Sequence, residues 1–185
     1  INIDDESLEK LNLSWPFQRK IFADTLKILA KYQPKLIALD FIFSDSKEKS
    51  DDQYFLETIT EINKKIPLVF AMSYFTKQTR QIIHKKKVTS VDIHFQIPFF
   101  QSDFGFVNVY LDQDDIIRRT QLMKSMNNKT YYSFPLRIAQ KVLKLKEHEI
   151  QYKKNQEIKL REKKIPLDEY NSALIHYIGP QNSVK

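Results

Sequence analysis

The stretch INIDDESLEKLNLSWPFQRKIFADTLKILAKYQPKLIALDFIF, residues 1–43, decides the fold of this chain. It predicts a strand over Ile1–Asp5, a helix over Pro16–Tyr32 and a strand over Leu36–Phe43. Apolar residues at helical spacing follow Pro16, which suits a first helical turn. The second strand is apolar almost throughout, which is typical of a central parallel strand covered on both faces. The stretch therefore predicts a β-α-β unit.

The next segment extends this unit. A polar loop over Ser44–Asp52 is followed by an amphipathic helix that Asp51 or Asp52 can cap, and then by a buried strand over Leu68–Tyr74. The predicted fold class is therefore α/β, a mainly parallel sheet with flanking helices and a β-α-β-α-β core. We expect Thr76–Ser102 to be an excursion that carries one short strand within Val91–Ile97.

The C-terminal half predicts an antiparallel extension. Phe104–Leu111 and Ile116–Ser125 should pair as a hairpin around the acidic turn of residues 112–115. Ser133 can cap a helix that runs to about Leu145. The remaining predicted elements are two late strands, Ile158–Pro166 and Ala173–Ile178, and a mobile connection over Lys144–Lys164.

Composition limits the classes of protein. The chain has 185 residues, 42% of them hydrophobic, which predicts a single folded domain over residues 1–185. It contains no cysteine, which excludes disulfides, thiol chemistry and cysteine-ligated zinc. The net charge is +7. We interpret its lysine clusters as a solvated surface and expect no nucleic acid partner, because no aromatic-basic binding motif accompanies them.

Membrane and targeting signals are missing from the segment itself. The most apolar run, Ile66–Met72, is far shorter than the ~20 residues that span a bilayer. The chain has neither a signal peptide nor an initiator methionine, and it opens inside a predicted strand. We therefore expect it to be a piece of a longer protein.

Each predicted strand of the opening unit carries an acidic residue near its carboxyl end. Asp4 and Asp5 end the first strand and Asp40 lies in the second, so parallel pairing would bring these carboxylates to the sheet edge where ligands gather. Such a cluster can bind a divalent cation or a polar ligand, or it can cap helix and loop amides. Arg19 can face an anionic ligand, or pair with Asp4, Asp5 or Asp40 in a structural ion pair.

A second polar constellation lies in the predicted hairpin. Asp112, Asp114 and Asp115 precede Arg118 and Arg119. The spacing faintly resembles a calcium loop, but the central glycine and the downstream glutamate are missing, so a polar turn is favoured. We retain Asp112 and Arg118 as candidate ligand-binding residues beside Asp4, Asp5, Arg19 and Asp40.

Catalytic and cofactor signatures are missing. The four histidines lack metal-ligand spacing, and two glycines are too few for a phosphate-binding loop. We expect Gly105 and Gly179 to be glycine because the backbone requires it at these positions, and not because they bind a phosphate. We therefore predict no catalytic residue and no cofactor, and leave the metal question open.

Six segments resemble, in the same order, the extracellular sensory domain of bacterial cyclases and histidine kinases known as CHASE, type two. They are Ile3-Asp4-Asp5-Glu6-Ser7-Leu8, Trp15-Pro16-Phe17-Gln18-Arg19, Ile37-Ala38-Leu39-Asp40-Phe41-Ile42-Phe43, Phe104-Gly105-Phe106-Val107-Asn108 with the acidic turn and two arginines that follow, Ser133-Phe134-Pro135-Leu136, and Ile175-His176-Tyr177-Ile178-Gly179-Pro180. Each segment is weak alone, whereas six in order across nearly the whole chain make a strong signal.

The sequence departs from the family pattern at one informative position. Asp115 stands where the family commonly has the glycine of an Asp-x-Asp-Gly turn. Since a non-glycine residue resists positive φ, either the turn differs or Asp115 has a role of its own. The family domain also commonly continues into another strand and an acidic loop, so the chain is expected to be truncated at its C-terminus.

The resemblance implies a role in signalling. Family members lie on the extracytoplasmic side of the cell membrane and are anchored by transmembrane helices outside the domain. Their output domains are nucleotide cyclases, histidine kinases or serine/threonine kinases. The resemblance implies a sensor that is not an enzyme, with a small-molecule or protein signal as partner and a homodimer in the full-length protein.

Two alternatives come from other classes of protein. The first is a metal-dependent hydrolase that uses the cluster of Asp4, Asp5 and Asp40 as metal ligands or as a general acid and base. The second is a dimerisation module that binds no small ligand.

Overall fold

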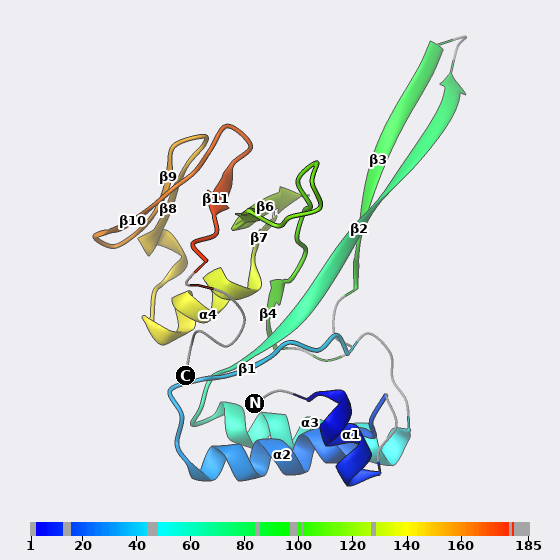
Figure 1. The fold of residues 1–185 in the computed structure, drawn as a ribbon, viewed down its shortest axis with the longest axis vertical. Helices are drawn as coiled ribbons and strands as arrows, with labels where there is room; N and C mark the ends of the chain where they lie inside the picture. Colours follow the sequence, from blue (N-terminus) through cyan, green and yellow to red (C-terminus); the bar gives the residue numbers. More distant parts are fainter. Residues whose placement is uncertain are drawn as a thin grey trace. The chain divides into compact units, whose positions relative to one another are not determined.

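The computed structural model of the protein describes residues 3–12, 16–43, 48–83, 86–96, 100, 102–126, 129–177 and 179. The chain forms two compact units, one made of residues 1–37 with 45–68 and the other of residues 38–44 with 69–185. Helices and sheets are mixed, and parallel and antiparallel pairings both occur (Figure 1). The predicted α/β class is therefore confirmed in its broad form, whereas the specific β-α-β-α-β core is not.

The first unit is helical. It contains α1 (Asp5–Leu11), α2 (Arg19–Lys31) and α3 (Lys49–Asn63), and α2 packs on α3. The two predicted helices of this region are thus present as α2 and α3, although α2 begins three residues later than Pro16. The packed face is apolar and consists of the buried residues Phe22, Ala23, Leu26, Phe55, Ile59 and Ile62.

The predicted strand over Ile1–Asp5 is wrong in its described part. Ile3 and Asp4 lie in no strand, Asp5 begins α1, and residues 1 and 2 lie outside the described residues. The reason is local, because the Asp4 carboxylate accepts a hydrogen bond from the Ser7 backbone N–H at 2.9 Å. Such an N-cap satisfies one of the orphan amides of a helix and outweighs the apolar alternation that suggested a strand.

The main sheet has the order β1-β2-β3, with β4 paired to β2. Its strands are β1 (Ile37–Leu39), β2 (Leu68–Ile83), β3 (Lys86–Gln96) and β4 (Asp103–Phe106). β1 is shorter than predicted and is not covered on both faces, because Ala38 is exposed between two buried neighbours. The predicted third strand is confirmed at its start but runs well past Tyr74.

The segment that we expected to be an excursion forms a long hairpin instead. β2 and β3 pair antiparallel from Ser73 opposite Gln96 to Ile83 opposite Lys86 (Figure 1). Repeated β-branched residues favour strands in this segment. The expected single strand within Val91–Ile97 is therefore only part of β3.

The predicted hairpin of Phe104–Leu111 with Ile116–Ser125 is also wrong. β4 pairs in parallel with β2, through Val69 to Met72. The second segment splits into two strands, β5 (Arg119–Gln121) and β6 (Met123–Met126), which have different partners. β6 forms a hairpin with β7 (Lys129–Tyr132), and β5 pairs with β11 (Ser172–Leu174). Partner choice in a sheet depends on tertiary contacts that local alternation does not encode.

The helix predicted from Ser133 is confirmed as α4 (Phe134–Val142), and the Ser133 hydroxyl accepts from the Leu136 N–H. It ends before Leu145 because Lys144 adopts a left-handed backbone, with φ 51°. The expected mobile connection over Lys144–Lys164 is wrong. That segment contains the 3₁₀ turn η1 (Glu147–Glu149) and three antiparallel strands, β8 (Ile150–Lys153), β9 (Glu157–Leu160) and β10 (Lys163–Pro166).

Burial of apolar residues explains why the segment Lys144–Lys164 forms regular structure. One buried cluster of the second unit contains residues from β7, α4, β8, β9, β11 and the segments that connect them: Leu122, Tyr132, Leu136, Leu145, Ile150, Ile158, Leu160, Leu167 and Ala173. A second cluster contains Met72, Tyr74 and Phe106. Alternate burial of Ile158 and Leu160 anchors a lysine-rich sheet that composition alone marked as mobile.

Candidate functional site

The acidic turn of residues 112–115 positions the first half of the candidate site. The Asp112 N–H donates to Ile116 O at 3.0 Å, and the Asp115 N–H donates to Asp112 O at 3.0 Å. Asp115 has φ 60°, in the left-handed region that glycine favours. The turn therefore keeps the conformation that a glycine would supply, and aspartate is among the residues that tolerate it best.

Arg118 closes on this turn. Its Nη1 and Nη2 donate to the two carboxylate oxygens of Asp114, each at 2.7 Å, and Nη1 also lies 3.3 Å from Asp112. The hydrogen bonds from Arg118 lower the pKa of Asp114 from 3.8 to about 2. This bidentate pairing is the geometry that a guanidinium and a carboxylate favour.

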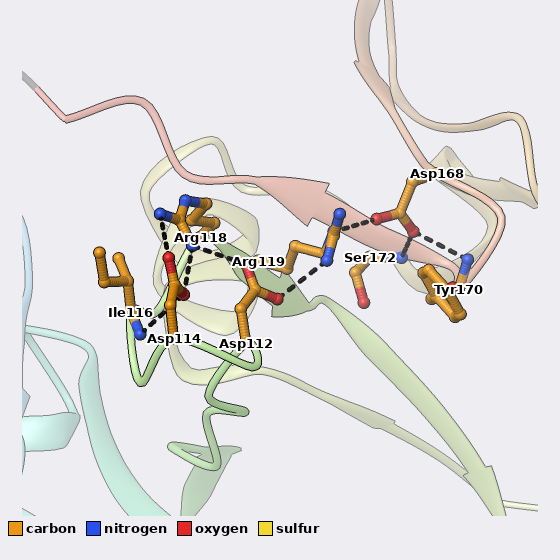
Figure 2. A network of polar contacts seen from close by, with 8 residues as sticks. All are labelled: Asp112, Asp114, Ile116, Arg118, Arg119, Asp168, Tyr170 and Ser172. Atoms are coloured by element: carbon orange, nitrogen blue, oxygen red, sulfur yellow. Dashed lines mark hydrogen bonds and ion pairs between the residues drawn. The ribbon is translucent and has the colours of Figure 1, made fainter.

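Arg119 continues the chain of charges. Its Nη1 donates to Asp112 at 2.9 Å, and its Nε lies 2.9 Å from the Asp168 carboxylate (Figure 2). The other oxygen of Asp168 accepts the backbone N–H groups of Tyr170 and Ser172, each at 2.9 Å. We call Asp112, Asp114, Arg118, Arg119 and Asp168 the acid–arginine network; all belong to the second unit.

The network joins segments that are far apart in the sequence. β5 begins at Arg119 and pairs antiparallel with β11, which follows the turn held by Asp168. The Ile175 N–H donates to Arg118 O at 2.8 Å, so the backbone of the first arginine also contacts the C-terminal segment. Direct contacts therefore connect the 112–115 turn to β11 and to the turn that precedes it.

Two hollows flank the network. One of about 370 Å³ and one of about 620 Å³ share Asp112, Arg119 and Tyr170 in their walls. Arg119 lies over the Tyr170 ring, 5.6 Å from its centroid. The network holds three carboxylates and two guanidiniums, so its formal charge is negative by one. A small charged ligand in either hollow would compete for these ion pairs.

Of the predicted site residues, the structure brings Asp112 and Arg118 together. Asp4 instead caps α1, and the hydrogen bonds of the Ser7 hydroxyl and N–H lower the pKa of Asp4. Asp5 is the first residue of α1, and Asp40 is exposed directly after β1. Asp4 and Asp5 belong to the first unit and Asp40 to the second.

Arg19 occupies a structural position. It is buried at the start of α2, and its Nε lies 3.6 Å from the buried carboxylate of Asp52 in α3. Arg19 thus pairs with Asp52, whereas the sequence offered Asp4, Asp5 or Asp40 as its partners. Asp52 itself was predicted as a helix cap but lies inside α3, which begins at Lys49.

Within the described ranges of the chain, no group of three or more His, Asp or Glu side chains could hold a metal ion. Nor does a helix in this part of the chain have the length and apolar character needed to cross a bilayer.

A family model for the CHASE2 domain matches residues 1–185, the whole chain. The chain belongs to the CHASE2 family. This confirms the resemblance drawn from the six sequence segments. CHASE2 domains are extracellular sensory domains of signalling proteins and are not catalytic. No curated protein and no solved structure matches the chain.

Sequence reasoning did not retain three members of the network in this CHASE2 chain, Asp114, Arg119 and Asp168, as candidate ligand-binding residues. Asp114 and Arg119 belong to the same acidic turn and arginine pair as the retained residues Asp112 and Arg118. Asp168 carries a local signal, since an aspartate that accepts amides two and four residues ahead is typical of a turn. Its pairing with Arg119 could not be predicted from neighbouring residues in the sequence, because the two residues meet only when β5 and β11 pair.

Proposed function

We propose that this CHASE2 chain is the extracytoplasmic sensor domain of a bacterial transmembrane receptor. Membership of the family over residues 1–185 is the observation that carries the proposal. The receptor would be anchored by transmembrane helices outside this segment, act as a homodimer, and drive a cyclase, histidine kinase or serine/threonine kinase. The domain itself performs no chemistry.

The acid–arginine network is the proposed ligand-responsive site. Asp112 and Arg118 would bind a small polar ligand, because both line the hollow of about 620 Å³ and already exchange a charged contact at 3.3 Å. A ligand that replaces this contact alters how the 112–115 turn is held against β5 and β11. A ligand shifts a two-state equilibrium only by its differential affinity for the two states, and re-pairing of charges supplies such a difference.

The location of the domain can be tested directly, because the chain contains no cysteine. Lys154→Cys places a single thiol in the exposed turn between β8 and β9. In the full-length protein, with other cysteines replaced, a membrane-impermeant maleimide should label this thiol in cells whose cytoplasmic membrane is intact. Labelling only after lysis would place the domain in the cytoplasm and refute the proposal.

The role of the network needs a separate experiment. Arg118→Gln and Asp114→Asn each remove one side of the same bidentate pair, so both should shift the output of the full-length receptor in the same direction. Lys163→Gln, at an exposed position of β10, is the matched control for loss of a surface charge. If the output stays at the wild-type level in both network variants, the network has no role in sensing and this part of the proposal is refuted.

A further inference from the structure

A third hollow, of about 600 Å³, lies between β4, β7 and the helix α4 and shares no wall residue with the two hollows of the network. Its walls carry two basic residues, Arg137 and Lys129, and two acidic ones, Asp103 and Glu147. Its volume lies within the range of ~300–1,000 Å³ that is typical of small-molecule sites.

Arg137 is held in place by neighbours that leave part of its guanidinium unused. Its Nε donates to Phe104 O at 3.1 Å, and its Nη1 donates to the buried Gln140 side chain at 2.7 Å. The guanidinium also lies over the Tyr132 ring, 4.6 Å from the centroid. These three contacts fix the plane of the group, and such preorganisation lowers the entropy lost when a ligand binds.

Arg137 has no acidic partner among the residues that the structure describes. In the part of the chain that the structure describes, no carboxylate lies within 4.0 Å of its guanidinium, and Nη2 has no hydrogen-bond partner. Of the two wall carboxylates, Asp103 is already paired with Lys141 at 2.5 Å. Arginine cannot lose its proton at physiological pH, so a half-buried guanidinium favours an anionic partner.

We propose that this hollow is a binding site for a small molecule that bears a carboxylate, and that Arg137 receives the carboxylate. A planar guanidinium with a free edge matches a carboxylate better than it matches a neutral group. Lys129 adds a second positive charge to the wall. The carboxylate can belong to a simple organic acid or to an amino acid, and Glu147 distinguishes them, since only the amino acid brings an ammonium group for it.

The test uses succinate and L-glutamate as probes and succinamide as the neutral control, with the 185-residue chain. At about 10 mM, a probe that binds the native state should raise the unfolding temperature by about 2 °C or more. Succinamide should not. In calorimetric titration, Arg137→Gln should weaken binding at least about tenfold. Lys163→Gln, which removes an exposed positive charge of β10 outside this hollow, is the control and should leave binding unchanged.

Glu147→Gln is the second variant, and its exposed position makes it safe for the fold. Removing this negative charge should tighten succinate binding by about threefold, and it should weaken glutamate binding if the ammonium group is held there. The proposal is overturned if neither acid binds the wild-type chain, if affinity survives in Arg137→Gln, or if Glu147→Gln changes the affinity for neither probe.

Discussion

Replacing Gly105 with alanine should lower the unfolding temperature of this CHASE2 chain, because the residue marks the closest approach of β4 to α4. A Cβ atom at this position would lie 2.4 Å from Phe134 Cα, 2.6 Å from Phe134 N and 2.9 Å from the carbonyl carbon of Ser133. Carbon atoms pack best at about 3.5–4.0 Å. The shortest contact is therefore too close by about 1.1 Å.

The contacted atoms are all backbone, so no change of side-chain rotamer can relieve the overlap. The backbone of β4 is also held by its pairing with β2, in which Gly105 lies opposite Ala71. In addition, Phe106 forms a bridge with Ser133, the residue before α4. Overpacking of this kind costs about 3 kcal/mol at the upper end of its usual range. Loss of glycine flexibility in the unfolded chain returns about 0.4–1 kcal/mol, which leaves a net loss of about 2 kcal/mol.

For a chain of this size, that loss corresponds to an unfolding temperature lower by about 4–8 °C. Thermal unfolding followed by circular dichroism measures it, and urea unfolding should give a lower midpoint with an unchanged slope. Ala38→Ser, which adds one heavy atom at an exposed position of β1, is the control and should have little effect. An unfolding temperature within about 1 °C of the wild type would refute the close approach of β4 and α4.

Three further predictions concern single side chains. The Asn108 side chain accepts from the Tyr74 N–H at 2.9 Å and donates to Tyr74 O at 2.7 Å, so Asn108→Ala should lower the free energy of unfolding in urea by about 2 kcal/mol. Asn108→Asp replaces the donor with a carboxylate oxygen that faces Tyr74 O, so it should cost at least as much; a negligible loss in either variant would contradict this account. Lys144 has φ 51°, so Lys144→Gly should raise the free energy of unfolding by about 1 kcal/mol, whereas Lys144→Ala, which keeps a Cβ atom, should give no such gain. Because hydrogen bonds from Arg118 lower the pKa of Asp114 from 3.8 to about 2, the stability that this pair provides is present above about pH 4 and is lost as the pH falls through about 2. A carbon NMR titration of Asp114 with a midpoint near 3.8 would contradict that pairing, and Asp114→Asn should flatten the dependence of stability on pH in this window.

Local sequence signals predicted the helices better than the strands. The apolar stripe of α2 and the Ser133 cap of α4 appear in the structure with ends displaced by a few residues. Helix signals are local, because hydrogen bonds and caps connect residues within one or two turns. The same locality explains the error at Asp4, where a cap to Ser7 outweighed the apolar alternation around it.

Strand pairing was predictable only in part. Leu68–Tyr74 was expected as a strand and forms the start of β2, but its parallel partner, β4, was assigned to a hairpin instead. Nothing within Phe104–Leu111 distinguishes a parallel partner on β2 from an antiparallel one next in the chain. That choice is decided by the packing of Phe106 with Met72 and Tyr74, which are distant in sequence.

The candidate site shows the same division. Asp112 and Arg118 lie six residues apart across one turn, so their meeting could be expected from spacing. Asp168 is far from Arg119 in the sequence and reaches it only through the pairing of β5 with β11. The clustering proposed for Asp4, Asp5 and Asp40 depended on a first strand that the described residues do not contain.

By itself, the sequence determined the family of this protein, the helices α2, α3 and α4, and the acidic turn that precedes two arginines. Each depends on the order of residues or on contacts within a few positions of the chain. Only the tertiary structure decided the partners of the strands, the need for glycine at position 105, and the position of Arg137 beside an open hollow. These features depend on which residues that are distant in the sequence come together in the folded chain, so no local sequence pattern reveals them.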